Sequence, residues 1–511
     1  MNTDLSTNKL NFSQLQSYFP FLIWLIGALL LFYYAPLRLV ARDEGYYIYA
    51  AELVAAGKLP YLDFFYPQMP LMPYLYGLVF KIFGSDWLVA RYLSAFFATL
   101  TLALLILYSR RFGLIASMLS TLLFCLSNFI LPWFLVVQTY ALATLFSFAA
   151  YLTLERALKS GNINRQVAFL AGALIGAAIM VRLPFAILAP AVLLYLVFKR
   201  VEHLVQLLLY FMLGLFISVL PALILLVSYW PEFLYNNLGY HLSRASRSWA
   251  AGIADKTKIM LILFGIIDSV KFVAWQFPLL LWGWFFVFML ELRRVRISLA
   301  SVFILALFVA HILPNPAYVH YFAVLIPWLI VVLIQLLGTK FFSAIHFRPR
   351  LVLFCILIFF CGTYCSGSLI DIDRYTRTGE GVIGIMNRSN AKRWTLEQVK
   401  LVQQKIDQIA KPGEVIYSSW PGFLVGSHAL AVPGTENHFG SFAASKLDPQ
   451  KSKQFKVLGF EEIRAQIRAK TVRVVVLIKN TAYGVPEALV EAGYIQAAVV
   501  GPARIFVIAG S

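Results

Sequence analysis

Long apolar runs recur along most of the 511-residue chain and limit its possible folds more than any other feature. A run of about 20 apolar residues spans the bilayer as an α-helix, because lipid offers no partner for an unpaired backbone amide or carbonyl. The chain is 60% hydrophobic and only 13% charged, and its mean hydropathy is +0.77. A soluble protein of this length would not be so apolar, so the sequence indicates a polytopic membrane protein.

The apolar pattern predicts eleven transmembrane helices, at 19–38, 86–108, 112–131, 134–154, 166–181, 183–198, 203–229, 273–291, 297–313, 320–338 and 350–367. The fifth and sixth spans are short and meet at Val181-Arg182-Leu183-Pro184, so a single bent or re-entrant element could replace them. If neither of these two spans crossed the membrane, every later segment would still lie on the same predicted side.

The basic residues between the spans predict the orientation of the chain. They cluster on every second connection, at Arg110/Arg111, Arg156/Lys159/Arg165, Lys199/Arg200, Arg293/Arg294/Arg296 and Lys340/Arg348/Arg350. Short loops rich in Lys and Arg stay in the cytoplasm. We therefore expect a cytoplasmic N-terminus and an extracytoplasmic C-terminus. A net charge of +19 could also indicate a protein that binds nucleic acid, but the sequence contains no basic aromatic module of the kind such proteins use. The basic clusters between the spans account for most of the charge.

The chain becomes polar after about Ser368 and predicts a second, smaller domain. Helix patterns at 395–410, 460–469 and 486–492 alternate with strand patterns at 414–418, 472–478 and 503–508. Such alternation is typical of a small α/β domain. The predicted fold is thus an all-α polytopic membrane domain over residues 1–367, followed by an extracytoplasmic α/β domain over 368–511.

Two adjacent carboxylates, Asp43 and Glu44, lie at the start of the first long outer loop, residues 40–85. Acidic side chains at the membrane face are unfavourable to bury but useful beside a headgroup cavity. An alternative is purely structural, since Asp43 could cap a helix that Glu44 begins.

Arg91 and Arg182 lie at the outer ends of predicted spans. A lone arginine within an apolar span costs about 2.5–3.5 kcal/mol on insertion scales, so it should face a partner or a polar cavity. Snorkelling of the side chain to the interface is the competing explanation.

Several motifs in one order resemble a known family. They are Asp43-Glu44-Gly45-Tyr46-Tyr47, Ala50-Ala51-Glu52, Gly57-Lys58-Leu59-Pro60-Tyr61-Leu62-Asp63, a proline-rich turn, Ala90-Arg91-Tyr92-Leu93-Ser94, and later His320-Tyr321-Phe322 before Pro327. The pattern resembles the bacterial protein-mannosyltransferase-like and aminoarabinose-transferase-like glycosyltransferases, which have the GT-C fold. The resemblance is specific over about 38–100, looser through 340, and absent as a motif in the tail.

This resemblance implies a membrane glycosyltransferase of the bacterial inner (plasma) membrane. It would transfer a sugar from a polyprenyl-phosphate donor to a lipid, glycan or protein acceptor on the extracytoplasmic face. Asp43 is then the candidate base, with Glu44 in positioning or metal binding, and Arg91 and Arg182 hold the donor phosphate. His320, Tyr321, Arg244 and Arg247 could line the headgroup site, although each could equally be an interfacial anchor or an ordinary loop charge.

One departure from the family pattern bears on whether the protein needs a metal ion. Many relatives carry an acidic residue near the outer start of the fourth helix, where this chain reads Val136-Val137-Gln138-Thr139-Tyr140. Gln138 cannot supply a charge, so a divalent metal ion, held by Asp43 and Glu44 if at all, is a possible but not a required cofactor.

Two other classes of function compete with sugar transfer. A lipid-linked sugar flippase or transporter would show inverted repeats and charges at mid-membrane depth, whereas no repeat is evident and the candidate charges cluster at outer ends. A non-catalytic scaffold of an envelope complex would not need the carboxylate pair Asp43-Glu44.

Overall fold

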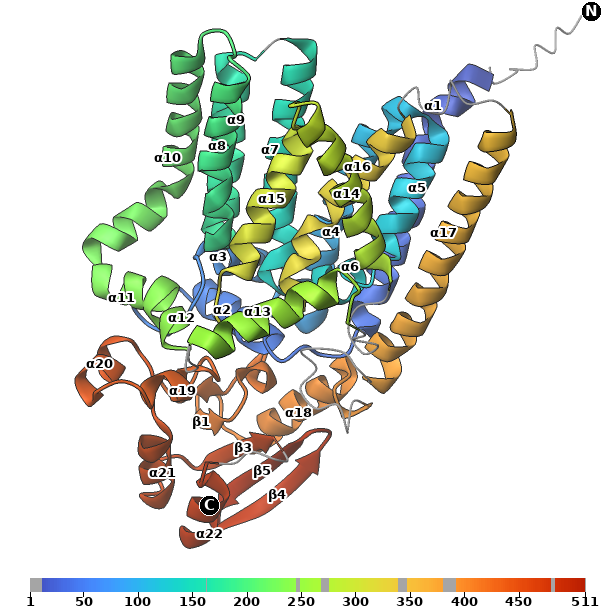
Figure 1. Ribbon diagram of the computed structural model, residues 1–511. Helices are drawn as coiled ribbons and strands as arrows, with labels where there is room; N and C mark the ends of the chain where they lie inside the picture. Colours follow the sequence, from blue (N-terminus) through green and yellow to red (C-terminus); the bar gives the residue numbers. More distant parts are fainter. Residues whose placement is uncertain are drawn as a thin grey trace, which may run out of the picture.

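The computed structural model describes residues 12–161, 163–244, 249–267, 275–338, 347–379, 392–478 and 483–510. A bundle of helices forms the larger part, and the C-terminal residues form a smaller unit against one end of it (Figure 1). Helix α1 (Phe12–Leu37) begins at the opposite end of the bundle (Figure 1). The fold is therefore mostly helical with a small C-terminal sheet, as the sequence predicts.

A helix overlaps each predicted span. These helices are α1 (Phe12–Leu37), α4 (Trp87–Ser109), α5 (Leu114–Cys125), α7 (Thr139–Ser160), α8 (Arg165–Val181), α9 (Leu188–Phe198), α10 (Leu204–Ser228), α14 (Gln276–Arg293), α15 (Leu299–Ile312), α16 (Ile326–Gly338) and α17 (Phe347–Asp373). Within the described residues, five segments are long and apolar enough to cross a membrane on length and composition alone, and several shorter helices are apolar. The count of eleven crossings stays a prediction.

The region of the fifth and sixth predicted spans contains two helices rather than one continuous rod. Helix α8 ends at Val181, Arg182 is extended, and a 3-10 turn (Leu183–Ile187) leads into α9. Pro184 ends the helical hydrogen-bonding pattern at this break because it lacks an N–H. Helix α8 instead packs tightly on α10, where a Cβ at Gly172 would lie 2.0 Å from the Phe211 carbonyl oxygen. Small residues allow such close backbone approach in membranes.

The first long loop, residues 40–85, is folded into helices that pack against the bundle. Helix α2 (Glu44–Ala55) begins directly after Asp43, and α3 (Leu71–Phe83) follows the proline-rich turn. Ten of the twelve residues of α2 are buried. Two further short helices, α11 (Trp230–Leu234) and α12 (Tyr240–Ser243), hold this loop, since the Asn236 side chain between them accepts the Tyr66 N–H at 2.8 Å.

The C-terminal unit is built on a five-stranded mixed sheet of order β2-β1-β3-β5-β4. Strands β2 (Leu430–Ala431), β1 (Val415–Ser418) and β3 (Val474–Ile478) run parallel, and β5 (Ala503–Ile508) pairs antiparallel with both β3 and β4 (Tyr494–Val500). Helices α18 (Leu396–Ile409), α21 (Phe460–Arg468) and α22 (Val485–Glu491) accompany the sheet. Helix α17 continues to Asp373, and the division of the chain at 367/368 stays a prediction.

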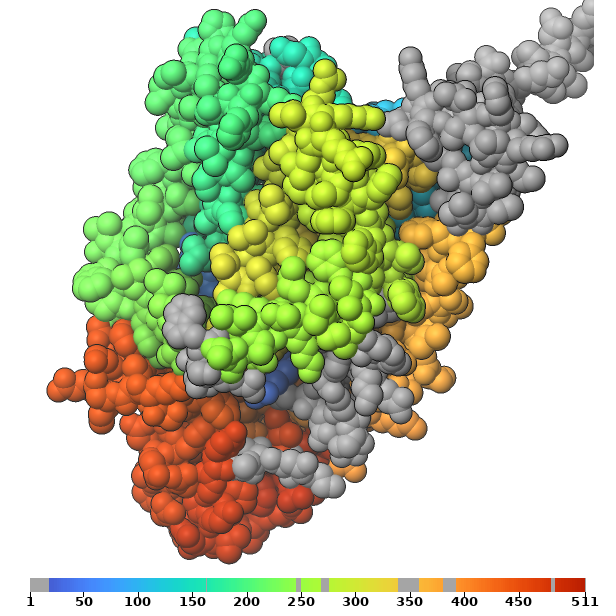
Figure 2. All heavy atoms as spheres, viewed as in Figure 1, coloured from blue at the N-terminus to red at the C-terminus, as the bar shows by residue number. Residues whose placement is uncertain are grey.

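The C-terminal unit binds directly to α2, the helix that follows Asp43. The Trp420 indole donates to the Arg42 carbonyl at 2.9 Å, and the same ring lies against Gly45, where a Cβ would be 2.6 Å away. Farther along α2, the Glu52 carboxylate accepts the Gly426 N–H at 2.9 Å. The space-filling view shows the two parts in direct contact (Figure 2). The C-terminal unit thus fixes the backbone that carries the carboxylate pair.

Candidate active site

Asp43 occupies the N-cap position of α2, but its side chain does not cap the helix. The carboxylate is half-buried, and the nearest opposing charges are those of Arg42 and Arg244. Burial raises the pKa of the Asp43 carboxyl above its usual range, and the two guanidinium groups oppose this shift. A carboxylate without a capping role and with a raised pKa is suited to accept a proton.

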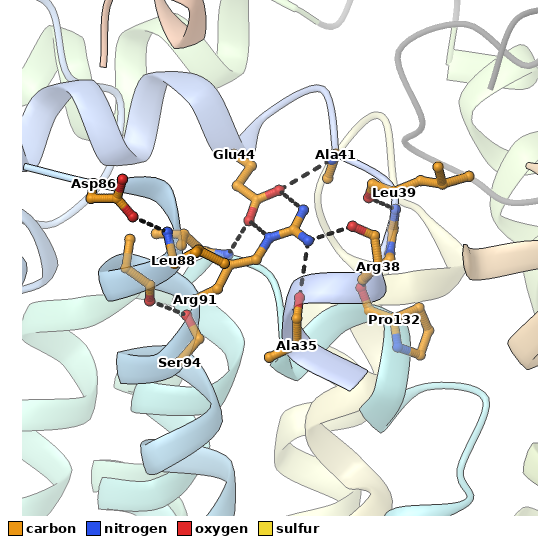
Figure 3. Close-up of polar contacts among 12 residues, drawn as sticks. Ala35, Arg38, Leu39, Ala41, Glu44, Asp86, Leu88, Arg91, Ser94 and Pro132 are labelled. Carbon is orange, nitrogen blue, oxygen red and sulfur yellow. Dashed lines mark hydrogen bonds and ion pairs between the residues drawn. The ribbon is translucent and has the colours of Figure 1, made fainter. Parts of the chain in front are cut away.

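Glu44 and Arg91 form a closed ion pair inside the protein (Figure 3). The guanidinium donates from Nε to Oε1 at 2.7 Å and from Nη2 to Oε2 at 2.8 Å, and both side chains are 0% exposed. The Glu44 carboxylate also accepts the backbone N–H groups of Ala41 at 3.2 Å and Val137 at 3.1 Å. Arg91 further donates to the carbonyls of Ala35 and Arg38, so the pair ties α1, α2, α4 and the start of α7 together.

Arg182 lies at the break between α8 and α9 and faces a group of aromatic rings. Its Nη1 donates to the Thr139 hydroxyl at 2.9 Å, and its guanidinium carbon lies 4.6 Å from the Tyr140 ring centre and 4.9 Å from that of Tyr321. The Arg182 Nε is buried and has no hydrogen-bond partner. We call Arg182, Tyr140 and Tyr321 the arginine–tyrosine cluster. An arginine with a free, buried donor can bind a phosphate oxygen.

Tyr47 joins Asp43 to this cluster. The residue is buried on α2 and feels the charges of both Asp43 and Arg182. Tyr321 lies within electrostatic reach of Asp43, Arg182 and Arg244 together. Four of the predicted site residues, Asp43, Arg182, Tyr321 and Arg244, therefore converge on one region.

His320 contacts the same group of aromatic rings. Its ring stacks on Trp133 with centroids 4.2 Å apart and meets Tyr140 edge-on at 6.0 Å. Its Nδ1 is buried without a partner. Arg244 donates to the Tyr318 hydroxyl at 3.3 Å. Arg247 lies outside the described residues.

Sequence reasoning missed Arg38, which lies immediately after α1. Its side chain is 2% exposed, with the guanidinium carbon 5.8 Å from the ring centres of Trp133 and Tyr375. The Arg38 Nη2 is buried and unpartnered. A charged residue directly at the end of an apolar span was the available signal. The charges of Arg38 and Arg182 both act on His320, whose ring stacks on Trp133.

The donor set at the carboxylate pair does not fit a metal held by both residues. The two Glu44 oxygens are taken by Arg91 and two backbone N–H groups. Gln138 is the N-cap residue of α7, and its amide oxygen is buried without a partner. Among the described side chains, no group of three His, Cys, Asp or Glu residues is placed to hold an ion. We derive no step through a metal.

Comparisons with known proteins place this geometry in a class. The family model for dolichyl-phosphate-mannose-protein mannosyltransferases matches residues 67–230. Among curated protein sequences, none matches the chain significantly. The structure of ArnT from Cupriavidus metallidurans bound to undecaprenyl phosphate is similar over 96% of this chain and 98% of that one, with TM-score 0.66 and 14% identity.

Two other structures share the fold more distantly. The archaeal oligosaccharyltransferase AglB from Archaeoglobus fulgidus, in complex with an inhibitory peptide and a dolichol-phosphate, has TM-score 0.53 and 14% identity over 97% of this chain and 74% of that one. The mycobacterial arabinofuranosyltransferase AftD has TM-score 0.50 and 11% identity over 96% of this chain and 40% of that one. The chain has the GT-C fold of these membrane proteins. The resemblance drawn from the sequence motifs is confirmed by the family model and by the fold.

Proposed function

We propose that the protein is an integral membrane glycosyltransferase that takes a sugar from a polyprenyl-phosphate donor on the extracytoplasmic face of the bacterial inner membrane. The observation that carries the proposal is the convergence of Asp43 with the arginine–tyrosine cluster, because this transfer requires a proton acceptor and a cation for the leaving phosphate. Structural neighbours whose names include undecaprenyl phosphate and dolichol-phosphate support the same kind of donor.

We assign the following roles in this proposal. Asp43 accepts the proton of an acceptor hydroxyl as its oxygen attacks the anomeric carbon of the donor sugar. The bond between that carbon and the phosphate oxygen breaks, and the leaving polyprenyl phosphate keeps the electron pair. The free Nε donor of Arg182 stabilises the charge that develops on this phosphate. His320, Tyr321 and Arg244 line the region between the two groups.

Glu44 and Arg91 have a different proposed role from the one the resemblance implies. Their polar atoms are used in holding each other and the surrounding backbone. We therefore assign both as positioning residues, which set the direction in which the neighbouring Asp43 points.

Sealed vesicles separate transfer from transport. Purified protein is reconstituted with a radiolabelled synthetic undecaprenyl-phosphate sugar, and envelope extract supplies acceptors. We expect labelled sugar in a new covalent product, identified by mass spectrometry. Movement of intact donor across the bilayer without such a product would establish a flippase instead, and binding with neither outcome would establish a scaffold.

The pH dependence of activity in a variant of the neighbouring Arg244 tests the role of Asp43 as the base. Because the base must be deprotonated, activity falls as the pH drops through the pKa of Asp43, which burial raises and Arg244 partly lowers. Replacing Arg244 with Gln removes one lowering charge, so the acidic limb of the kcat profile should move to higher pH. Lys58→Gln, an exposed outer-loop substitution, is the control and should leave the limb in place. An unmoved limb in the Arg244 variant would mean that Asp43 does not set it.

A further inference from the structure

A cavity of about 240 Å³ lies between the C-terminal unit and the outer segments of the membrane part. Arg42, Tyr240 and Arg244 line it from the membrane part, and Phe439, Phe442 and Lys446 line it from the C-terminal unit. We call this cavity the interdomain pocket. It exists only because the two parts are in contact, and the carbonyl of Ser243 accepts a hydrogen bond from the Lys446 ammonium across the boundary.

The charges of the interdomain pocket are all positive. Arg42, Arg244 and Lys446 contribute three cations, and the described residues that line the pocket include no carboxylate. Arg42 and Lys446 are exposed, and the Arg42 guanidinium lies 5.4 Å from the Phe439 ring centre. Guanidinium and ammonium groups without an acidic partner in the pocket are suited to bind an anion such as a phosphate.

The aromatic side chains and the volume of the interdomain pocket further restrict the ligands that it can bind. Phe439 and Phe442 give the pocket apolar walls, which suit the carbon face of a ring. Its volume is below the range of about 300–1,000 Å³ that is usual for drug-sized ligands. A single ring with an anionic substituent matches this volume, whereas an extended peptide does not.

Asp43 is a chain neighbour of a residue that lines this pocket. It follows Arg42 directly in the chain, and its carboxyl feels the charges of Arg42 and Arg244, which both line the pocket. Tyr47, on the helix that follows Asp43, feels the charges of both Asp43 and Arg182. Asp43 therefore has two cationic sites in its neighbourhood, one at Arg182 and one in the interdomain pocket.

We propose that the interdomain pocket is the acceptor subsite, and that it binds a ring-bearing headgroup with an anionic substituent, half of the contacts coming from the C-terminal unit. The role of this headgroup as the acceptor rests on the proposed function, whereas its binding to the pocket does not. A hydroxyl of the bound ring faces Asp43, and the donor phosphate occupies the opposite side at Arg182. Acceptor choice is then a property of the segment around Phe439–Lys446, which explains why a transferase of this fold carries the C-terminal unit against its site.

Binding of defined probes to the purified full-length protein tests the proposal. Calorimetry in detergent uses inositol 1-phosphate and neutral inositol, and nanodiscs containing phosphatidylinositol present the same headgroup on a lipid. We expect the phosphorylated ring to bind and neutral inositol not to bind. Lys446→Ala should weaken binding about tenfold, the typical effect of losing one charged contact. Lys453→Ala, an exposed lysine outside the pocket, is the matched control and should bind as the wild type does.

The different probes distinguish a soluble acceptor from a lipid-linked one, and the acceptor from the donor lipid. Binding of inositol 1-phosphate supports a soluble or a lipid-linked acceptor, and binding only in phosphatidylinositol nanodiscs supports a lipid. Equal binding of neutral inositol, or a Lys446 variant with unchanged affinity and unchanged melting temperature, would overturn the proposal. Competition by undecaprenyl phosphate would also overturn it, because the pocket would then hold the donor. None of these results depends on turnover, so failure here and failure of the proposed transfer reaction are distinguishable.

Discussion

The Asp43→Asn variant should fold normally and lose sugar transfer by about 10²–10⁴-fold in kcat, which is the usual contribution of a positioned general base. Asparagine has nearly the shape of aspartate but cannot take the proton of an acceptor hydroxyl. The substitution also removes a half-buried charge from beside Arg42 and Arg244 without breaking a helix cap, because Asp43 makes no capping bond. The measurement is single-turnover transfer from a synthetic undecaprenyl-phosphate sugar by reconstituted protein.

Asp63→Asn is the matched control in the same loop, residues 40–85. Asp63 is exposed and accepts the Leu59 N–H at 2.7 Å, a bond that an amide oxygen also makes. This variant should keep wild-type turnover. The residual activity of the Asp43 variant should in addition lack the acidic limb of the pH profile, which a loss of folding alone would not remove. Undiminished transfer by Asp43→Asn would take the base role away from this residue.

Hydropathy located the membrane helices because lipid imposes one simple requirement, a long apolar run with all backbone groups bonded within the helix. The observed helix α4 (Trp87–Ser109), for example, differs from the predicted span 86–108 by one residue at each end. Helix α3 was missed because its 13 residues, with Pro73 inside the first turn, are too few to span a bilayer and follow a proline-rich turn. Strand β4 was missed because Ala497, Ala498 and Gly501 weaken its pattern and only pairing with β5 defines it.

Part of the candidate site could also be predicted from the sequence. A carboxylate pair after the first helix and an arginine at a helix break are visible in the sequence, and in the structure the charges of Asp43 and Arg182 both act on Tyr47. The sequence cannot show that Glu44 points inward to a residue 47 positions later while its neighbour Asp43 remains half-buried. Nor can it show that Arg42 and Lys446, separated by nearly the whole chain, line one pocket. Such contacts arise from packing between distant segments.

Breaking the Glu44–Arg91 pair should have the largest effect on stability. Both side chains are 0% exposed, so removal of one partner leaves a buried charge without compensation. Arg91→Met or Glu44→Gln alone should lower the free energy of unfolding by about 3–5 kcal/mol. The double variant should lose less than the sum of the two single variants, because neither charge then remains buried alone. Denaturant unfolding of the protein in detergent measures all three differences.

An exposed pair in the same chain provides the control for this prediction. Arg468 and Glu491 are joined at 2.7 Å, but their side chains are 49% and 56% exposed, so Arg468→Met should change stability by less than about 1 kcal/mol. The comparison also decides between two roles for Arg91. A positioning residue gives a variant that is unstable and, where it still folds, binds undecaprenyl phosphate with normal affinity. A variant as stable as the control but weakened in phosphate binding would instead return Arg91 to the donor site that the family resemblance implies, and Glu44 would then have to be reconsidered as part of the reacting group.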